Sequence, residues 1–464
     1  MLYVLCLVVF IPACISLTDC IYNIFMRKGV PVFFTILIFI SFRVTAQQQT
    51  DSLLKDASLE NCIAYAVEKQ AVVQQAKIDE AITEDAIKSK LSEWFPQVNF
   101  NYTFQYNFQV QTSVIGGNPV KLGVDNTSGL MFTLNQALFN RDVLLASRTR
   151  ADVRRQAQQN TESVKIDVAA NVSKAFYDVL TTEQQIKVSG ENIVRLERSY
   201  KDAYNQYQAG IADKTDYKRA AIALNNTKAA KKSYEVLLKA RIENLKAQMN
   251  YPIDASLKIV YDSTQMEKEI RLDTTQAPDY KRRIEYQLLT TQQKLQEANV
   301  QYNKWSFLPQ LSANGAYNLN YLNNDFNKLY NQSYPASYAG LTLSFPIFQG
   351  GKRKYNIQQA QWQLRRTNLD IVNLRNAVNA EYNAALANYK SNYAGYIAIK
   401  ENLVLAKEVY DIIQLQYKSG IKTYLEVITS ETDLRSAQIN YYNALYELLA
   451  SKIDVQKAVG AIRY

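Results

Sequence analysis

The sequence predicts a mostly α-helical, internally duplicated protein with a few β-strands suited to a membrane. Three observations predict this fold class. Glycine and proline are scarce, at 14 and 9 of 464 residues, against usual shares of about 7% and 5%, which leaves room for long helices. Short motifs recur in the same order at one spacing. Between the helical stretches, aromatic and uncharged polar residues alternate with the period of a strand.

The N-terminus has the anatomy of an export signal. Residues 26–28 are a short basic region, 30–42 an apolar core and 44–46 a small-residue cleavage site. We therefore predict a signal peptide over residues 1–46 and expect translation to begin at Met26. The rival interpretation is a transmembrane anchor, but a span needs roughly 20 apolar residues, and this run is shorter.

Composition excludes most enzyme chemistry. The chain has no histidine, which removes histidine acid–base catalysis, Ser-His and Cys-His pairs and nearly every catalytic zinc site. Of four cysteines only Cys62 follows residue 46, so neither an internal disulfide nor a cysteine metal cage can form in the mature chain. We predict no catalytic, cofactor-binding or metal-binding residue, and no enzyme activity. The basic residues that give the net charge of +10 are interspersed with acidic residues along the chain. This pattern favours solvated helix faces over a nucleic-acid-binding patch.

Three motifs organise the mature chain as two copies of one unit. The paired segments are 94–98 and 307–311, 133–139 and 342–348, and 207–211 and 417–421. Self-similarity at one spacing is the signature of an internal repeat. We predict a first repeat over 47–252 with a helix, a β-hairpin and a long helix pair. A connecting equatorial segment follows over 253–278, and the second repeat covers 279–464.

Each repeat contains a predicted hairpin with two unlike faces. In the first repeat the alternating aromatics are Phe100, Tyr102, Phe104, Tyr106 and Phe108, and Asn, Thr and Gln occupy the positions between them. A loop containing Gly116 and Gly117 precedes the return strand. A soluble hairpin with one buried face is the alternative. We favour transmembrane strands with a lipid-facing outside and a watery lumen, because the alternation fits a membrane strand.

Long helical stretches follow each hairpin. Residues 140–210 contain no proline and one glycine, Gly190, and residues 351–420 repeat this with Gly395. At 1.5 Å per residue, each helix would span roughly 100 Å. Apolar residues at heptad spacing predict a coiled-coil seam: Ile186, Ile193, Leu196, Tyr200, Ala203 and Tyr207.

These features together resemble the TolC family of outer-membrane channel proteins, and the resemblance covers residues 57–462. The Tyr-x-x-Gly turns at 207–210 and 417–420 resemble the paired helix tips of that family. The resemblance implies a homotrimer in which each chain gives four strands to one twelve-stranded β-barrel and long helices to an α-barrel crossing the periplasm. Elementary physics agrees, because four strands cannot close a barrel and open strand edges cannot face lipid.

The resemblance also implies a function and partners. The protein would be the passive exit duct of a tripartite efflux or type I secretion system, located in the Gram-negative outer membrane and extending into the periplasm. Its partners would be outer-membrane lipid, a periplasmic adaptor (membrane fusion) protein and an inner-membrane transporter of RND or ABC type. The alternative is a periplasmic coiled-coil adaptor or scaffold without a pore.

Site residues follow from the resemblance by position. Asp216, Tyr417 and Lys422 would form a periplasmic gate, although Lys422 stands where the best-studied family member has an arginine, and a lysine lacks the bidentate fork. Glu426 would contribute to a lumen acidic ring. The bland alternative is that these are polar residues of solvated helix ends.

The tip residues Gly210, Ile211, Gly420 and Ile421 would contact the adaptor. The two glycines have a second justification, since a tight helix reversal favours a left-handed residue directly after the helix.

Overall fold

The computed structural model describes residues 54–261, 263–272 and 279–464, without the side chains of 263–265. The chain separates into residues 1–53 and a second unit, 54–464, and the predicted signal peptide over 1–46 lies outside the described residues. The second unit is mostly helical and contains four strands in its main sheet, which confirms the predicted fold class.

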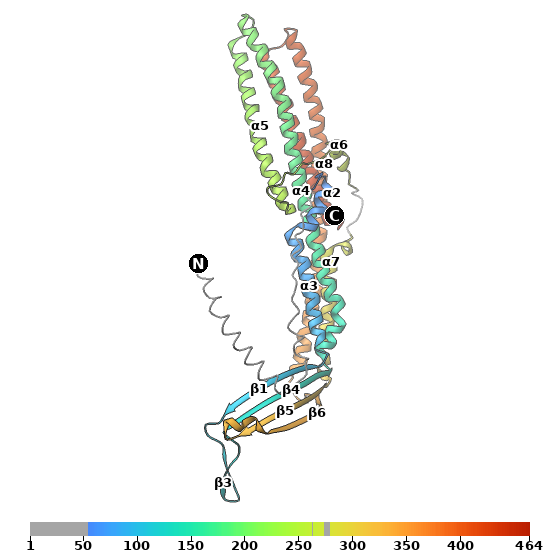
Figure 1. Ribbon diagram of the computed structural model, residues 1–464. Helices are drawn as coiled ribbons and strands as arrows, with labels where there is room; N and C mark the ends of the chain where they lie inside the picture. Colours follow the sequence, from blue (N-terminus) through green and yellow to red (C-terminus); the bar gives the residue numbers. More distant parts are fainter. Residues whose placement is uncertain (1–53, 262, 273–278) are drawn as a thin grey trace. The chain divides into compact units, whose positions relative to one another are not determined.

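The first copy of the layout contains two helices, two strand pairs and then two long helices (Figure 1). Its elements are α2 (Leu59–Lys69), α3 (Ala71–Ser92), β1 (Gln97–Tyr106), β2 (Thr112–Ile115), β3 (Asn118–Lys121), β4 (Asn126–Phe139), α4 (Arg141–Gln208) and α5 (Lys214–Met249). The short helix α6 (Ser263–Glu269) lies in the connection to the second copy.

The second copy repeats the order helix, strand pair, long helix and returning helix. Its elements are η3 (Tyr280–Arg282), α7 (Ile284–Lys304), η4 (Trp305–Phe307), β5 (Gln310–Asn323), η5 (Phe326–Asn331), β6 (Ser333–Ser344), α8 (Lys352–Lys418) and α9 (Tyr424–Ala458). The 68-residue α4 passes through Gly190 and the 67-residue α8 passes through Gly395 without interruption. Both long helices are therefore as predicted.

The main sheet is antiparallel, with the strand order β1-β4-β5-β6. Two details of the sequence prediction are wrong. β1 ends at Tyr106, so Phe108 lies beyond the strand. The expected loop around Gly116 and Gly117 is a second hairpin, β2–β3. Both glycines have positive φ, so a two-residue turn forms there, and the β-prone residues beside it pair.

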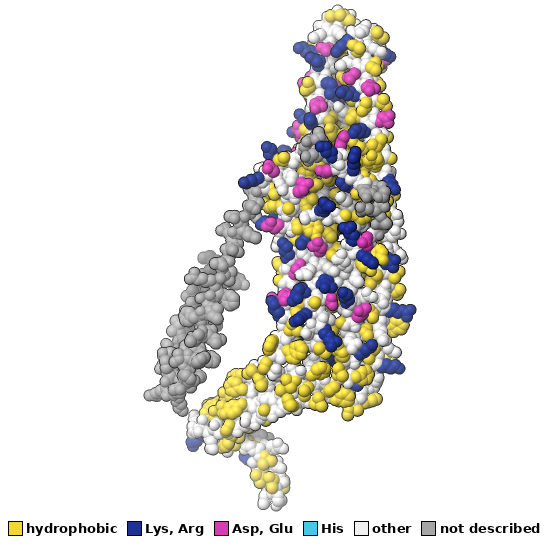
Figure 2. Space-filling view, turned by 90° about the vertical axis from the view of Figure 1, so that its right-hand side faces the viewer, with side chains coloured by type: hydrophobic (Ala, Val, Ile, Leu, Met, Phe, Trp, Pro, Cys, Tyr) yellow, Lys and Arg dark blue, Asp and Glu magenta, His cyan; other side chains and the backbone are white. Residues whose placement is uncertain are grey.

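Cross-strand partners give the sheet two unlike faces, because directly opposed residues share a face. We call one the aromatic face; it contains the register partners Phe100, Phe132 and Tyr317, and the Phe100 and Phe132 rings lie 4.9 Å apart. We call the other the amide face; it contains Asn101 and Asn318. The four strands carry no charged residue. Figure 2 shows hydrophobic side chains gathered over the sheet and charged ones spread over the helices.

The helix η5 packs on the loop end of the aromatic face. Phe326 meets Phe104 edge to face at 5.7 Å, and the Tyr330 hydroxyl lies 2.9 Å from that of Tyr102. Among the described residues, no helix combines the length and the apolar character that a membrane span requires.

The main core joins both copies around the middle of α4. Phe176 of α4, Met249 of α5 and Leu448 of α9 are fully buried in it. The connecting helix α6 adds polar contacts on the same level. Glu269 accepts a hydrogen bond from the Tyr177 hydroxyl at 2.6 Å, and Glu267 binds Lys400 of α8 at 2.9 Å. The sheet and the free helix ends therefore extend from a common apolar core.

Candidate functional site at the paired helix tips

The helix hairpins α4–α5 and α8–α9 contain the same turn. In each hairpin the turn follows the long helix, at the end of that helix farther from the strands. Gly210 has φ +76° and Gly420 has φ +74°. In each turn the glycine N–H donates to the carbonyl of a tyrosine, from Gly210 to Tyr207 at 3.0 Å and from Gly420 to Tyr417 at 2.9 Å. The following isoleucine N–H donates one residue further back. This is the Schellman motif, and it confirms the predicted left-handed glycines.

Ile211 and Ile421 project from these turns. A hydrophobic residue at this position of a Schellman motif commonly packs back against its own helix. Here the two side chains are 78% and 71% exposed. They form a repeated pair of apolar contacts at the tips, available to another molecule.

Lys422 and Glu426 bind each other at the start of α9. The Lys422 ammonium donates to Glu426 at 2.6 Å, while the other carboxylate oxygen accepts from the backbone N–H of Thr423 at 2.9 Å. Thr423 caps α9, and with Glu426 it forms a complete capping box. The hydrogen bond from Lys422 and those from Thr423 lower the pKa of Glu426 to about 2. Within one chain Glu426 is therefore a charged capping residue.

Asp216 occupies the equivalent place in α5 but a different environment. It follows Gly210 at the distance at which Glu426 follows Gly420, and it is half-buried. Burial, and then the nearby charge of Asp213, raise the pKa of Asp216. Burial is the main cause of a raised pKa of Tyr417, and the charge of Asp216 contributes to the same shift. The structure thus brings Asp216 near Tyr417, whereas Lys422 binds Glu426 instead of Asp216.

Hydrogen bonds between side chains connect α4 of the first copy to α8 and α9 of the second. We call this set the polar seam. Its pairs and distances are Gln185–Asn443 at 2.8 Å, Asn192–Gln438 at 3.3 Å, Ser199–Tyr424 at 2.8 Å and Gln206–Tyr417 at 2.6 Å. The predicted coiled-coil seam on α4 includes the buried Leu196 and Ala203. The hydrogen-bonded pairs lie between these apolar positions, and a pattern of apolar residues alone did not predict them.

Glu431 lies inside the polar seam and is the least satisfied group there. Glu431 is only 4% exposed. Neither of its carboxylate oxygens has a hydrogen-bond partner among the described residues, and the nearest cation, the Arg195 guanidinium of α4, is 3.9 Å away. Burial raises the pKa of Glu431 to about 7, against the opposing charges of Arg195 and Arg435. A buried carboxyl of this kind titrates near neutral pH.

Glu431 could have been found from the sequence by its position. The inward positions of α9 are Tyr424, Val427, Glu431, Leu434, Gln438, Tyr441, Leu445 and Leu448. They are three and four residues apart in turn, as in a heptad repeat. A glutamate at one of these inward positions marks a candidate functional residue. A search for clustered charges does not detect it.

An open groove of about 1120 Å³ lies between α4 and α8 near the tips. Arg198 and Asp202 of α4, Tyr410 and Gln414 of α8, and Tyr424 of α9 line it. No group of three His, Cys, Asp or Glu side chains able to hold a metal ion occurs in the part of the chain that the structure describes. The groove offers charged, polar and aromatic contacts.

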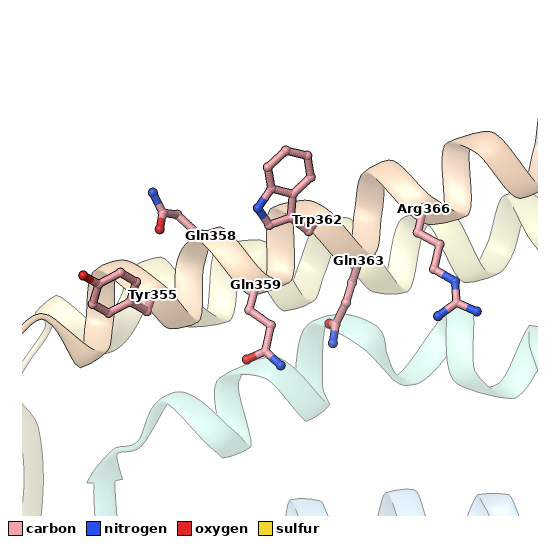
Figure 3. Close-up of a pocket in the computed structure, with 6 residues that line it drawn as sticks. All are labelled: Tyr355, Gln358, Gln359, Trp362, Gln363 and Arg366. Atoms are coloured by element: carbon pink, nitrogen blue, oxygen red, sulfur yellow. The ribbon is translucent and has the colours of Figure 1, made fainter.

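A second, smaller hollow follows the first turns of α8. It measures about 490 Å³ and is lined by Tyr355, Gln358, Gln359, Trp362, Gln363 and Arg366. Figure 3 shows Gln359, Gln363 and Arg366 pointing to one side of the helix and Trp362 to the other. The rings of Tyr355 and Trp362 are exposed. Among the described residues of the single chain, this exposed face of α8 therefore has no packing partner.

Comparison with known proteins gives a consistent result. The family model described as outer membrane efflux protein matches residues 63–250 and 287–461. The outer membrane protein TolC of Escherichia coli strain K12 is 21% identical over 437 residues, covering 86% of this chain and 83% of that protein. The TolC of Vibrio cholerae is 20% identical over 382 residues, covering 82% and 85%.

Solved structures share the fold at low identity. A structure of CusC has a TM-score of 0.72 at 15% identity, covering 88% of this chain and 92% of that chain. The open state of the Neisseria gonorrhoeae MtrE outer membrane channel has a TM-score of 0.69 at 17% identity, covering 87% and 89%.

Alanine at the tip glycine and at a mid-helix glycine should have opposite effects on stability. An added Cβ meets no atom at Gly420 or at Gly395, so backbone conformation decides. Gly420→Ala should lower the free energy of unfolding by about 1–2 kcal/mol, because a left-handed alanine is strained. Gly395→Ala should raise it by about 1 kcal/mol, because alanine favours a helix. Urea denaturation of both variants measures this; equal signs would contradict the tip geometry.

Glu431 should make stability depend on pH. In the fold its carboxyl keeps a proton up to about pH 7, while the ordinary value is 4.5, so the unfolded chain releases the proton first as pH rises. The free energy of unfolding should therefore fall from about pH 4.5 to 7 and stay low above it, by up to a few kcal/mol.

The neutral variant Glu431→Gln should remove this fall. Asp433→Asn, at an exposed position of the same helix, is the matched control and should keep it. Denaturation at pH 5 and pH 8 compares the three proteins. A wild-type protein equally stable at both values would refute the assignment.

Proposed function

The chain belongs to the outer membrane efflux protein family, and we propose that three copies of it form the exit duct of a tripartite efflux or type I secretion system. It is an outer-membrane efflux channel of the TolC type. The single observation that carries the assembly of several copies is the sheet: four uncharged strands end in two open edges, β1 and β6. Unpaired edge groups are costly in lipid, so copies must pair them.

The helices next to the open edges support the same assembly. Within one chain α3 packs on α4, α4 on α7 and α7 on α8, which leaves α3 and α8 as the outer members of the row. α3 leads into β1 and α8 follows β6. Both outer helices therefore lie on the sides of the two open strands, and one copy can offer α8 to α3 of the next.

The exposed side chains of these helices are complementary at matching heights. Ile82 and Trp362 lie the same number of residues from the sheet-side ends of their helices, α3 and α8. Both side chains are exposed. A ring closed by such unlike surfaces is heterologous. Packing between copies would then cover the hollow that one chain leaves open.

The tips would be the regulated entrance of the duct. We assign the gate to Asp216, Tyr417 and Lys422, supported by the nearness of Asp216 to Tyr417 and by the Tyr417–Gln206 hydrogen bond. Glu426 carries a charge at neutral pH, as a lumen acidic ring would need. Gly210, Ile211, Gly420 and Ile421 would receive a periplasmic adaptor, whose inner-membrane transporter, of RND or ABC type, supplies the energy.

Two measurements test the duct. Purified protein in detergent should have the mass of three chains by light scattering, and it should produce discrete single-channel currents in planar bilayers. A monomer that never conducts would instead favour the alternative, a periplasmic scaffold without a pore.

Tyr417→Phe should increase the single-channel conductance at rest. The change deletes the hydroxyl that donates to Gln206 across the polar seam, and a hydrogen bond contributes about 0.5–1.5 kcal/mol. Tyr204→Phe is the matched control, because the Tyr204 hydroxyl makes no hydrogen bond to any described residue while its ring stacks on Tyr200 at 6.3 Å. Equal conductance in both variants would remove Tyr417 from the gate.

A further inference from the structure

The first half of the edge strand β6 reverses the side-chain pattern of the other three strands. Ser337 pairs with Tyr317, so a serine takes the place of a ring on the aromatic face. The next residue, Tyr338, pairs with Ala316, and Tyr334 pairs with Asn320. Both β6 tyrosines therefore stand on the amide face.

These two rings are the aromatic side chains of the amide face. The other positions of that face on β1, β4 and β5 carry Asn, Gln, Ser, Thr, Gly, Ala, Met and Leu. Tyr338 is 61% exposed and Tyr334 is 45% exposed. Neither has a hydrogen bond or a ring contact with the rest of the described chain. Packing within the described part of the chain therefore leaves both rings accessible.

The surroundings of the rings make them prominent. Ala316, opposite Tyr338, has a short side chain, and so does Ala336 between the two tyrosines on the same face. At about 3.3 Å per residue, the two tyrosines lie roughly 13 Å apart along the strand. With no charge on any of the four strands, the rings are the groups of this face with the most surface for stacking.

We propose that Tyr334 and Tyr338 are contact sites for solutes that carry aromatic rings, on the water-filled side of the channel. This rests on the proposed function, in which the aromatic face meets lipid and the amide face lines the lumen. Flat rings stack on tyrosine, and aromatic cations add an attraction to the ring face. Contacts of this size slow a solute without trapping it, as a conducting pore requires.

In the trimer, β6 of one copy would lie beside β1 of the next. The amide face of β1 carries Asn99, Asn101 and Thr103, so the neighbouring strand brings no ring to pair with Tyr334 or Tyr338. Three copies give three such pairs around the lumen. The contact sites would therefore remain open after assembly, and solutes with aromatic rings would be delayed relative to aliphatic solutes of the same charge.

The test compares block of single-channel current by two monovalent cations in planar bilayers. Tetraphenylphosphonium carries aromatic rings and tetrabutylammonium does not. The wild-type protein should be blocked at a concentration of the aromatic ion about two- to tenfold lower, the factor that one ring contact supplies. The double variant Tyr334→Leu/Tyr338→Leu, which keeps bulk without an aromatic ring, should bring this ratio close to one.

Tyr317→Leu is the matched control, because its ring lies on the aromatic face opposite Ser337; it should keep the wild-type ratio. If the double variant forms no channels, the single variant Tyr338→Leu decides, with a reduced ratio expected. An unchanged ratio in the leucine variants, or no discrimination by the wild-type protein, overturns the proposal. A wild-type protein that never conducts refutes the proposed function instead.

Discussion

The constraint on which this structure depends is the pairing of backbone groups at the edges of its sheet. β1 and β6 each present one side without a strand neighbour, and the strands bear no charge that would protect an exposed edge. In lipid no water can satisfy these groups. The flanking helices α3 and α8 follow the same two sides, so two continuous surfaces, one from β1 to α3 and one from β6 to α8, are left for other copies.

A gradient in the packing of α4 explains how a long helix can be fixed at one level and separable at another. Around Phe176 the contacts with α5, α9 and the connecting segment are apolar and buried. Toward the tips the same helix meets α9 through a smaller apolar cluster around Ala203 and Tyr424, mixed with hydrogen bonds and the unsatisfied Glu431. Burial of large apolar side chains stabilises more than such polar pairs do. The tip end is therefore the weaker end of the contact, where an entrance could open without disturbing the core.

The two repeats share a backbone plan and differ in chemistry at equivalent places. Both tips use a left-handed glycine and an exposed isoleucine. Asp216 and Glu426 follow these glycines at the same distance, yet one has a raised pKa near Tyr417 and the other a lowered pKa in a capping box. The strands diverge too, since the rings of β6 stand on the amide face. Duplication supplied the geometry, and substitutions within it distinguish the copies.

The sequence by itself determined the layout, because periodicity and chain breakers act locally. The uninterrupted helices, the alternating strands and the tip glycines all follow from spacing along the chain. Only the tertiary structure decided which side chains meet. Glu431 is buried against Arg195, and Tyr338 shares a face with Ala316. These outcomes depend on helix rotation and strand register between distant segments. A one-residue shift of register moves every side chain to the other face, and periodicity within one strand carries no information about its register with the next.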